Sequence, residues 1–199
     1  MKLKFKLIAV LVLLSALSCL GAIKINKGID LYAETTVKNS VYTEVSNAIY
    51  TYVRANGELF AQAVTRSFDK NGELVCVNIN AAAMNSIQTG LEKEILATLE
   101  SIESTSFYLS LGSLSGIKLL SDTGPKIKMK IVPLGTLSCD TINSFDSVGI
   151  NHTLHKVGLN FTVKFNAAAP FKSTAFETKF TLLICESVII GKVPEVFFN

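Results

Sequence analysis

The chain holds only two histidines, and they stand three residues apart. His152 and His155 follow Gly149 in the stretch GINHTLHKVGLNFTVKF. A histidine pair can ligate a metal ion or supply a general base, but either chemistry needs further ligands or a nucleophile held nearby. If the strand after this motif begins near Asn151, the two side chains point to opposite faces, because residues three apart on a strand do so. We therefore expect no shared metal site.

No other stretch has the spacing of a reaction centre. Ser115 lies in LGSLSG, which lacks both the Gly-Lys-Ser/Thr ending of a phosphate loop and the pattern of a nucleophile elbow. A hydrolase acting on cell wall would need His155 to meet an acidic partner such as Asp146 or Glu186 in an open cleft. The sequence favours a non-enzyme, with no catalytic residues, no metal ligands and no cofactor.

The four cysteines do not form a disulfide framework. Cys19 lies in an apolar N-terminal run, which leaves Cys76, Cys139 and Cys185, an odd number with wide spacing. One disulfide fits an exported domain, but buried free thiols are the simpler interpretation.

The N-terminus predicts a membrane segment. Residues 7–23 carry no charge, and three lysines within residues 2–6 precede them. This pattern indicates an uncleaved signal-anchor whose N-terminus stays in the cytoplasm. Cleavage after Ser18 and lipid attachment at Cys19 are the two alternatives. All three export the rest of the chain, so we divide it into a membrane segment, 1–27, and an exported domain, 28–199.

The net positive charge of the chain comes from the same N-terminal segment, which also raises the mean hydropathy. The net charge is +3 and the mean hydropathy is +0.40. Without the three N-terminal lysines, 16 basic residues remain against 16 acidic ones. A neutral exported domain argues against nucleic acid as a partner.

Residues 28–104 predict a helix, a hairpin and a second helix. Apolar residues at steps of three and four indicate a helix over 30–54, which continues the membrane helix with Gly28 as the site of any bend. Asn71-Gly72 within Leu59–Ile79 is typical of a hairpin turn. Asn80 then caps a helix. Its predicted buried stripe consists of Met84, Ile87, Leu91, Ile95, Leu99 and Ile102.

Residues 105–199 predict long antiparallel strands. The clearest strand has Val157 to Phe165 on one face at every second position, and Phe176 to Ile184 is expected to pair with it. Phe107, Leu109 and Leu111 alternate in a shorter strand. Lysines at every second position of 126–130 indicate a solvated sheet face or the protection of an edge strand. The expected fold class is α+β, an antiparallel sheet covered on one side by the helices.

A set of motifs follows in fixed order along this second half. The residues concerned are Gly124, Pro125, Pro133, Gly135, Gly149, Ile150, Asn151, His155, Glu186, Gly191 and Pro194. In this order and spacing the chain resembles the YunB family of sporulation proteins from endospore-forming Firmicutes. The resemblance covers about 111–199 and, more loosely, 41–102.

The resemblance implies a protein made in the mother cell during sporulation and needed for efficient spore formation. With an N-terminal anchor it would lie in the mother-cell-derived forespore membrane and face the space between mother cell and forespore. The implied partner is another sporulation protein or a second copy of the chain. The family pattern reads Gly-Ile-Asn-Gln-Thr-x-His, so His152 stands where a Gln is usual and only His155 fits. The motif residues are therefore interpreted as structural, with Asn151 and His155 hydrogen-bonded to backbone around a turn.

Two function classes fit these observations. The first is a structural or interaction module, with ring-like self-assembly as one variant. The alternative is a lipid-binding module with an apolar groove between a helix and a curved sheet. The twelve phenylalanines and the lysines of 126–130 would suit acyl chains and headgroups.

Overall fold

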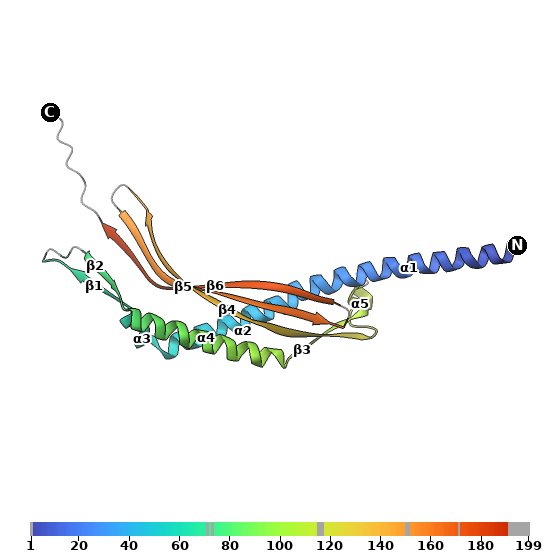
Figure 1. The fold of residues 1–199 in the computed structure, drawn as a ribbon, viewed down its shortest axis with the longest axis horizontal. Helices are drawn as coiled ribbons and strands as arrows, with labels where there is room; N and C mark the ends of the chain where they lie inside the picture. Colours follow the sequence, from blue (N-terminus) through green and yellow to red (C-terminus); the bar gives the residue numbers. More distant parts are fainter. Residues whose placement is uncertain are drawn as a thin grey trace, which may run out of the picture. The chain divides into compact units, whose positions relative to one another are not determined.

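The computed structural model describes residues 2–70, 72, 74–114, 118–149, 152–170 and 172–190 (Figure 1). In the N-terminal helix, side chains are described only for residues 11–15 and from residue 21 onward, and those of Val75 and Thr136 are also outside the description. The elements in chain order are α1 (Lys2–Tyr32), η1 (Ala33–Val37), α2 (Lys38–Ala55), α3 (Gly57–Ala63), β1 (Val64–Phe68), β2 (Leu74–Ile79), α4 (Ala81–Glu103), β3 (Ser106–Ser110), α5 (Leu111–Leu114), η2 (Lys118–Leu120), β4 (Lys126–Ser147), β5 (His152–Ala169) and β6 (Lys172–Ile190).

Helices and antiparallel sheets make up the fold. Strands β1 and β2 form a two-stranded sheet, and the larger sheet has the order β3-β4-β5-β6. Helices pack on the sheet through the buried residues of both, so the predicted α+β class is confirmed.

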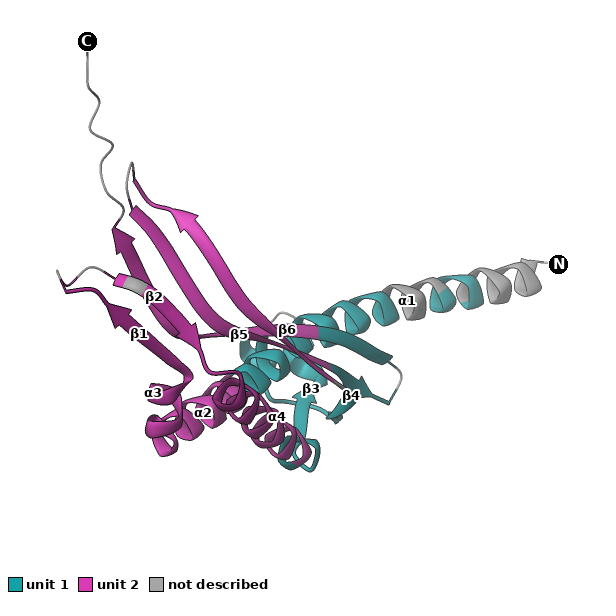
Figure 2. Ribbon diagram, turned by 60° about the vertical axis from the view of Figure 1, so that its left-hand side comes forward, with its two compact units in different colours: residues 1–42, 101–134, 165–176 teal, residues 43–100, 135–164, 177–199 magenta. Residues whose placement is uncertain are grey.

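The chain divides into two compact units, and each unit takes segments from both halves of the sequence (Figure 2). Unit 1 consists of Met1–Tyr42, Ser101–Leu134 and Phe165–Phe176, and unit 2 of Thr43–Glu100, Gly135–Lys164 and Glu177–Asn199. Each unit therefore combines residues of 28–104 with residues of 105–199.

The predicted membrane segment falls in large part on side chains outside the description. Helix α1 runs without interruption from Lys2 to Tyr32. Within the part of the chain whose side chains are described, no helix is long and apolar enough to span a bilayer. The structure thus does not show a membrane helix, and the segment 1–27 stays a prediction.

Gly28 is not a bend, because it lies inside α1. A Cβ atom at Gly28 would lie 2.1 Å from Leu114 Cδ2. Its missing side chain therefore allows α5 to approach α1 within unit 1. The sequence indicated that Gly28 matters for the helix, but not that it allows the close contact with α5.

A π-helical turn, η1, joins α1 to α2. The buried apolar residues here are spaced by four: Ile29, Ala33, Val37, Val41 and Val45. In a regular α-helix such a stripe drifts by about 40° at each step, because four residues exceed one turn. The wider π-turn offsets part of this drift. The helix predicted over 30–54 from its apolar spacing is confirmed, with Val37, Val41 and Val45 buried along it, and the π-turn was not predicted.

The hairpin forms where the sequence placed it, but its first arm is shorter. Val64 pairs with Ile79 and Phe68 with Leu74, and Gly72 adopts a φ of 80° in the turn. Residues Gly57–Ala63 form helix α3, so the strand expected from Leu59 is wrong over this part. The run ELFAQA carries no β-branched residue, which favours a helix over a strand.

Helix α4 confirms its prediction. Asn80 Oδ1 accepts hydrogen bonds from the backbone N–H of Ala82 and Ala83, at 3.1 and 3.2 Å, as an N-cap does. All six residues of the predicted stripe are buried. The stripe runs along one side of the helix and packs into the core.

The strands of the larger sheet also follow their predicted alternation. Val157 to Phe165 are buried at every second position of β5, and the lysines of residues 126–130 are exposed on β4. Since β4 lies between β3 and β5, these lysines line a solvated face and do not protect an edge. Leu111, expected to extend β3, instead begins α5, although its N–H still donates to Pro125 O at 3.0 Å.

Candidate functional site

His155 is the centre of the candidate site, and it is enclosed. It lies on the buried side of β5 with 2% of its surface exposed. Its Nε2 lies 2.8 Å from Asn143 Oδ1, so Nε2 donates to the amide oxygen. The Phe145 ring stacks on the imidazole at 4.3 Å between centroids and an angle of 7°. Two side chains of β4 therefore hold the imidazole ring, which belongs to β5. All three residues lie in unit 2.

The other nitrogen of this ring, Nδ1, has no hydrogen-bond partner among the described atoms. A buried polar atom without a partner costs free energy, about 1–3 kcal/mol in mutational data. The packing of Phe145 and the bond to Asn143 must offset this cost. The expected bond from His155 to backbone around the turn is wrong, since the partner is the Asn143 side chain.

The two histidines do not share a site. His152 is exposed at the first position of β5, whereas His155 is buried. The separation predicted from strand geometry is confirmed. Among the residues that the structure describes, no three His, Cys, Asp or Glu side chains gather in a way that could hold a metal ion.

The acidic partners expected for a hydrolase lie elsewhere. Asp146 pairs with Lys156 at 3.2 Å, and Glu186 is exposed between the buried residues Cys185 and Ser187. The described contacts of His155 are to an amide and an aromatic ring. This arrangement does not build the open His–carboxylate cleft that such a reaction needs.

Several family-motif residues constrain the backbone, either before β4 or within it. Gly124 adopts a φ of 82° and Gly135 a φ of 68°, a region that favours glycine. Pro125 follows Gly124 directly and accepts from Leu111 N–H. Pro133 is half-buried in β4. These residues therefore set the conformation of the backbone.

The remaining motif residues lie around the β4–β5 connection and the C-terminus. Val148 N–H bonds to His152 O at 3.0 Å, which closes the connection that holds Gly149. Ile150 and Asn151 within it, and Gly191 and Pro194 beyond β6, lie outside the described residues. Their predicted structural roles stay predictions.

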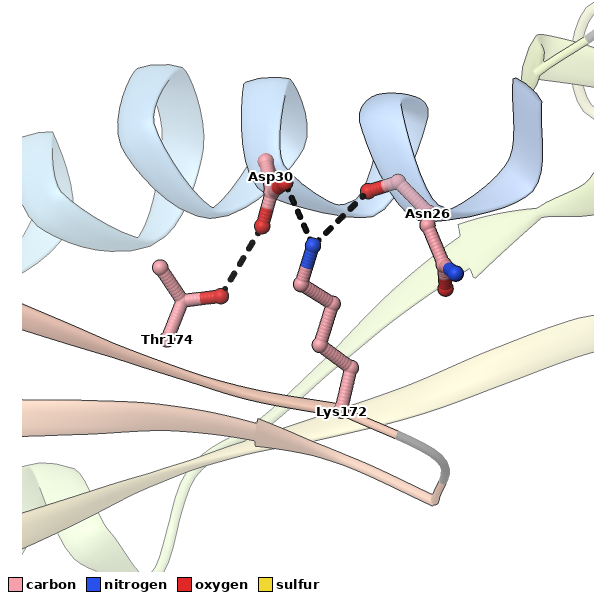
Figure 3. Close-up of polar contacts among 4 residues, drawn as sticks. All are labelled: Asn26, Asp30, Lys172 and Thr174. Carbon is pink, nitrogen blue, oxygen red and sulfur yellow. Dashed lines mark hydrogen bonds and ion pairs between the residues drawn. The ribbon is translucent and has the colours of Figure 1, made fainter. Parts of the chain in front are cut away.

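A polar cluster that the sequence did not indicate links α1 to β6 within unit 1 (Figure 3). Lys172 Nζ donates to Asp30 Oδ2 and lies 3.5 Å from Asn26 O, and Thr174 Oγ1 donates to Asp30 Oδ1 at 3.0 Å. The hydrogen bond from Lys172 lowers the pKa of the Asp30 carboxyl, and Thr174 and the Lys172 charge act in the same direction against partial desolvation. No local pattern could reveal this cluster, because 142 residues separate Asp30 from Lys172.

The cysteines outside α1 are free thiols. Cys185 is buried beside Arg66, whose guanidinium lies 3.0 Å from its Sγ and 3.0 Å from Ser187 Oγ. Burial raises the pKa of the Cys139 thiol to about 11, and the charges of Glu92 and Asp140 add to this. Cys76, Cys139 and Cys185 are thus free thiols as expected, but only Cys185 is buried, whereas Cys139 is half-buried and Cys76 is exposed.

Two shallow depressions occur on the described surface. One is lined by residues 54–59 and Gln62, and the other by exposed positions of α4 from Thr89 to Glu100. Neither is the apolar groove between helix and sheet that a lipid-binding module would need. Such a module stays a prediction.

Comparisons with known proteins agree with the motifs. The family described as sporulation protein YunB matches residues 106–196, which cover β3 to β6. Sporulation protein YunB of Bacillus subtilis (strain 168) is 26% identical over 141 residues, which are 66% of this chain and 55% of the relative. The chain thus spans little more than half the length of this relative. No solved structure matches the chain. The second half of this chain resembles the sporulation protein YunB family, as its ordered motifs predicted.

Proposed function

We propose that this chain is a membrane-anchored sporulation protein that acts as a structural or interaction module in the space between mother cell and forespore. The observation that carries the proposal is the match of residues 106–196 to a family of sporulation proteins. A relative named sporulation protein YunB, 26% identical, supports the same general role in sporulation.

The geometry around His155 supports a structural role in preference to a reaction. Its ring is held between Asn143 and Phe145, and no carboxylate contacts it among the described side chains. A group that acts on a substrate must reach it, and a side chain with 2% exposure does not. These contacts support a structural role for His155, in which it holds β5 against β4.

The anchor in this proposal rests on the sequence. Residues 7–23 are uncharged and follow three lysines, which favours export of the domain behind them. The neutral balance of the exported part suits a protein partner better than a nucleic acid.

Deletion of the gene in its own sporulating host tests the role. We expect fewer heat-resistant spores, and restoration by the full chain but not by a chain that lacks residues 2–27. Growth before sporulation serves as the control and should be unchanged. Normal spore counts in the deletion strain would contradict the proposal, and full rescue without residues 2–27 would contradict the anchor.

A further inference from the structure

Strand β6 is an unprotected edge of the larger sheet. The strand order is β3-β4-β5-β6, and β1 pairs with β2, so the outer side of β6 has no partner strand in the described chain. The strand is 19 residues long, and it contains neither a proline nor a residue of positive φ. The backbone groups of such an edge pair readily with another strand.

The opposite edge of the sheet is short and interrupted. Strand β3 covers the start of β4, where Ser106–Ser110 pair with Lys126–Lys130. Further along β4, Pro133 has no N–H to donate, and Gly135 has a φ of 68°. These features hinder pairing with a further strand. Strand β3 is itself an edge strand, but it is only 5 residues long, so β6 with 19 residues is the longer edge of the sheet.

Charge along β6 indicates which strand fits it. Glu177 and Lys179 are exposed, two residues apart and of opposite charge, and both lie in unit 2. Within the chain Glu177 lies 3.6 Å from Lys179 and 3.7 Å from Lys164, so it is in a position to exchange these exposed ion pairs for one with a second copy. In an antiparallel pair of two β6 strands centred on Thr178, Glu177 of one copy stands directly opposite Lys179 of the other. Two-fold symmetry repeats this contact, and opposite charges in directly opposed positions stabilise a sheet.

The residue at this centre supplies an independent observation. Thr178 is buried, and its Oγ1 has no hydrogen-bond partner among the described atoms. In the pair centred on Thr178, the two Thr178 side chains of the two copies face each other. A threonine pair in directly opposed positions can hydrogen-bond across the strands, which would satisfy both hydroxyls.

We propose that two copies of this chain pair antiparallel through β6 to form a symmetric dimer centred on Thr178. The inference rests on the proposed interaction role, which it deepens by naming the partner as a second copy. The dimer would extend the four-stranded sheet into an eight-stranded one across the two-fold axis.

The test uses the full chain in detergent, with its mass measured by native mass spectrometry and sedimentation over a range of concentrations. We expect a dimer whose dissociation constant rises about tenfold in Glu177→Lys and in Lys179→Glu, because each change opposes like charges at two symmetric positions. The double variant, Glu177→Lys with Lys179→Glu, restores pairing to near the original strength. Thr178→Val weakens the dimer without lowering the melting temperature of the monomer, because its hydroxyl has no partner among the described atoms of the chain.

Lys128→Glu is the matched control for Lys179→Glu, since it makes the same charge change at an exposed position of β4. It should leave the dimer unchanged. A monomer at every concentration overturns the pairing, as does a dimer that is indifferent to the changes at residues 177–179, because it must form through another surface. Either result leaves the role in sporulation standing, since that role is tested separately by spore counts.

Discussion

At the scale of single residues, the two histidines differ in their burial and in their contacts. His155 is buried, bonded to Asn143 and stacked on Phe145, whereas His152 is exposed. The enclosure of His155 follows from its place on the apolar side of β5. A pair that first suggests chemistry is therefore one core residue and one surface residue.

This difference gives a prediction on stability. His155→Ala should lower the free energy of unfolding by about 2–4 kcal/mol, because it removes a packed ring and leaves the Asn143 amide without its partner. His152→Gln should change it by less than about 0.5 kcal/mol, as is usual at exposed positions. Urea unfolding followed by circular dichroism measures both. Equal and severe loss of spore formation from both changes, with folding intact, would instead indicate a histidine site.

The Asp30 carboxyl predicts a pH dependence. Its pKa in the folded state lies below the ordinary value of 3.8, so its link to Lys172 stabilises the fold above that value and is lost as the pH falls through the folded pKa. The side chains of Lys172 and Asp30 are 29% and 43% exposed, so the effect is below about 1 kcal/mol. The stability difference between the original chain and Asp30→Asn should be present at neutral pH and shrink as the pH falls below 3.8.

Asp122→Asn is the control for this measurement. Asp122 has a φ of 65°, which asparagine also tolerates, and it makes no described ion pair. Its substitution should not change the pH profile. A profile of Asp30→Asn that runs parallel to that of the original chain at all pH values would exclude the link as a source of stability.

At the scale of elements, close backbone approach is the tightest constraint in the sheet. A Cβ atom on Gly158 of β5 would lie 2.4 Å from the backbone oxygen of Leu182 on β6. Backbone cannot move aside as a flexible side chain can. The two long strands therefore keep their spacing only because residue 158 is a glycine.

Gly158→Ala should destabilise the fold by about 1–3 kcal/mol, the range for overpacked sites. Gly57→Ala is the matched control, because nothing lies within 4 Å of a Cβ atom there. We expect that control to be neutral or slightly stabilising, since alanine favours a helix. Thermal unfolding distinguishes the two, and equal melting temperatures would contradict the prediction.

The helices and strands also show which features could be predicted from the sequence. The stripe of α4, its Asn80 cap and the alternation of β5 are local periodic patterns, and all three are confirmed. Helix α3 and the start of α5 were missed, because short helices carry too few residues to show a period. The Asp30 and Arg66 contacts were missed because their partners lie more than 100 residues away.

At the scale of the whole molecule, the two halves of the sequence depend on each other. Unit 1 takes Met1–Tyr42 from the first half and unit 2 takes Thr43–Glu100, while the strands of the second half contribute to both. The family-matched part, 106–196, contains the sheet but not α2 or α4. Its buried face needs the helices of the first half.

A fragment of residues 105–199 should therefore not fold alone, because β5 would expose a continuous apolar face. We expect it to aggregate, to bind a hydrophobic dye and to show no cooperative unfolding. Expression together with residues 28–104 should yield a soluble complex with a cooperative transition. A soluble, cooperatively unfolding fragment 105–199 would contradict this dependence.

The contact between Asp30 and Lys172 also has a consequence for how the chain acquires its structure. The two residues are 142 positions apart and meet only after the ribosome has made all the residues between them, when most of the chain has already emerged. Contacts of such long range slow folding, because the entropy of closing the loop is lost before the contact forms. Unit 1 therefore stays open during synthesis, and a chain bound for export would reach the secretion machinery still unfolded.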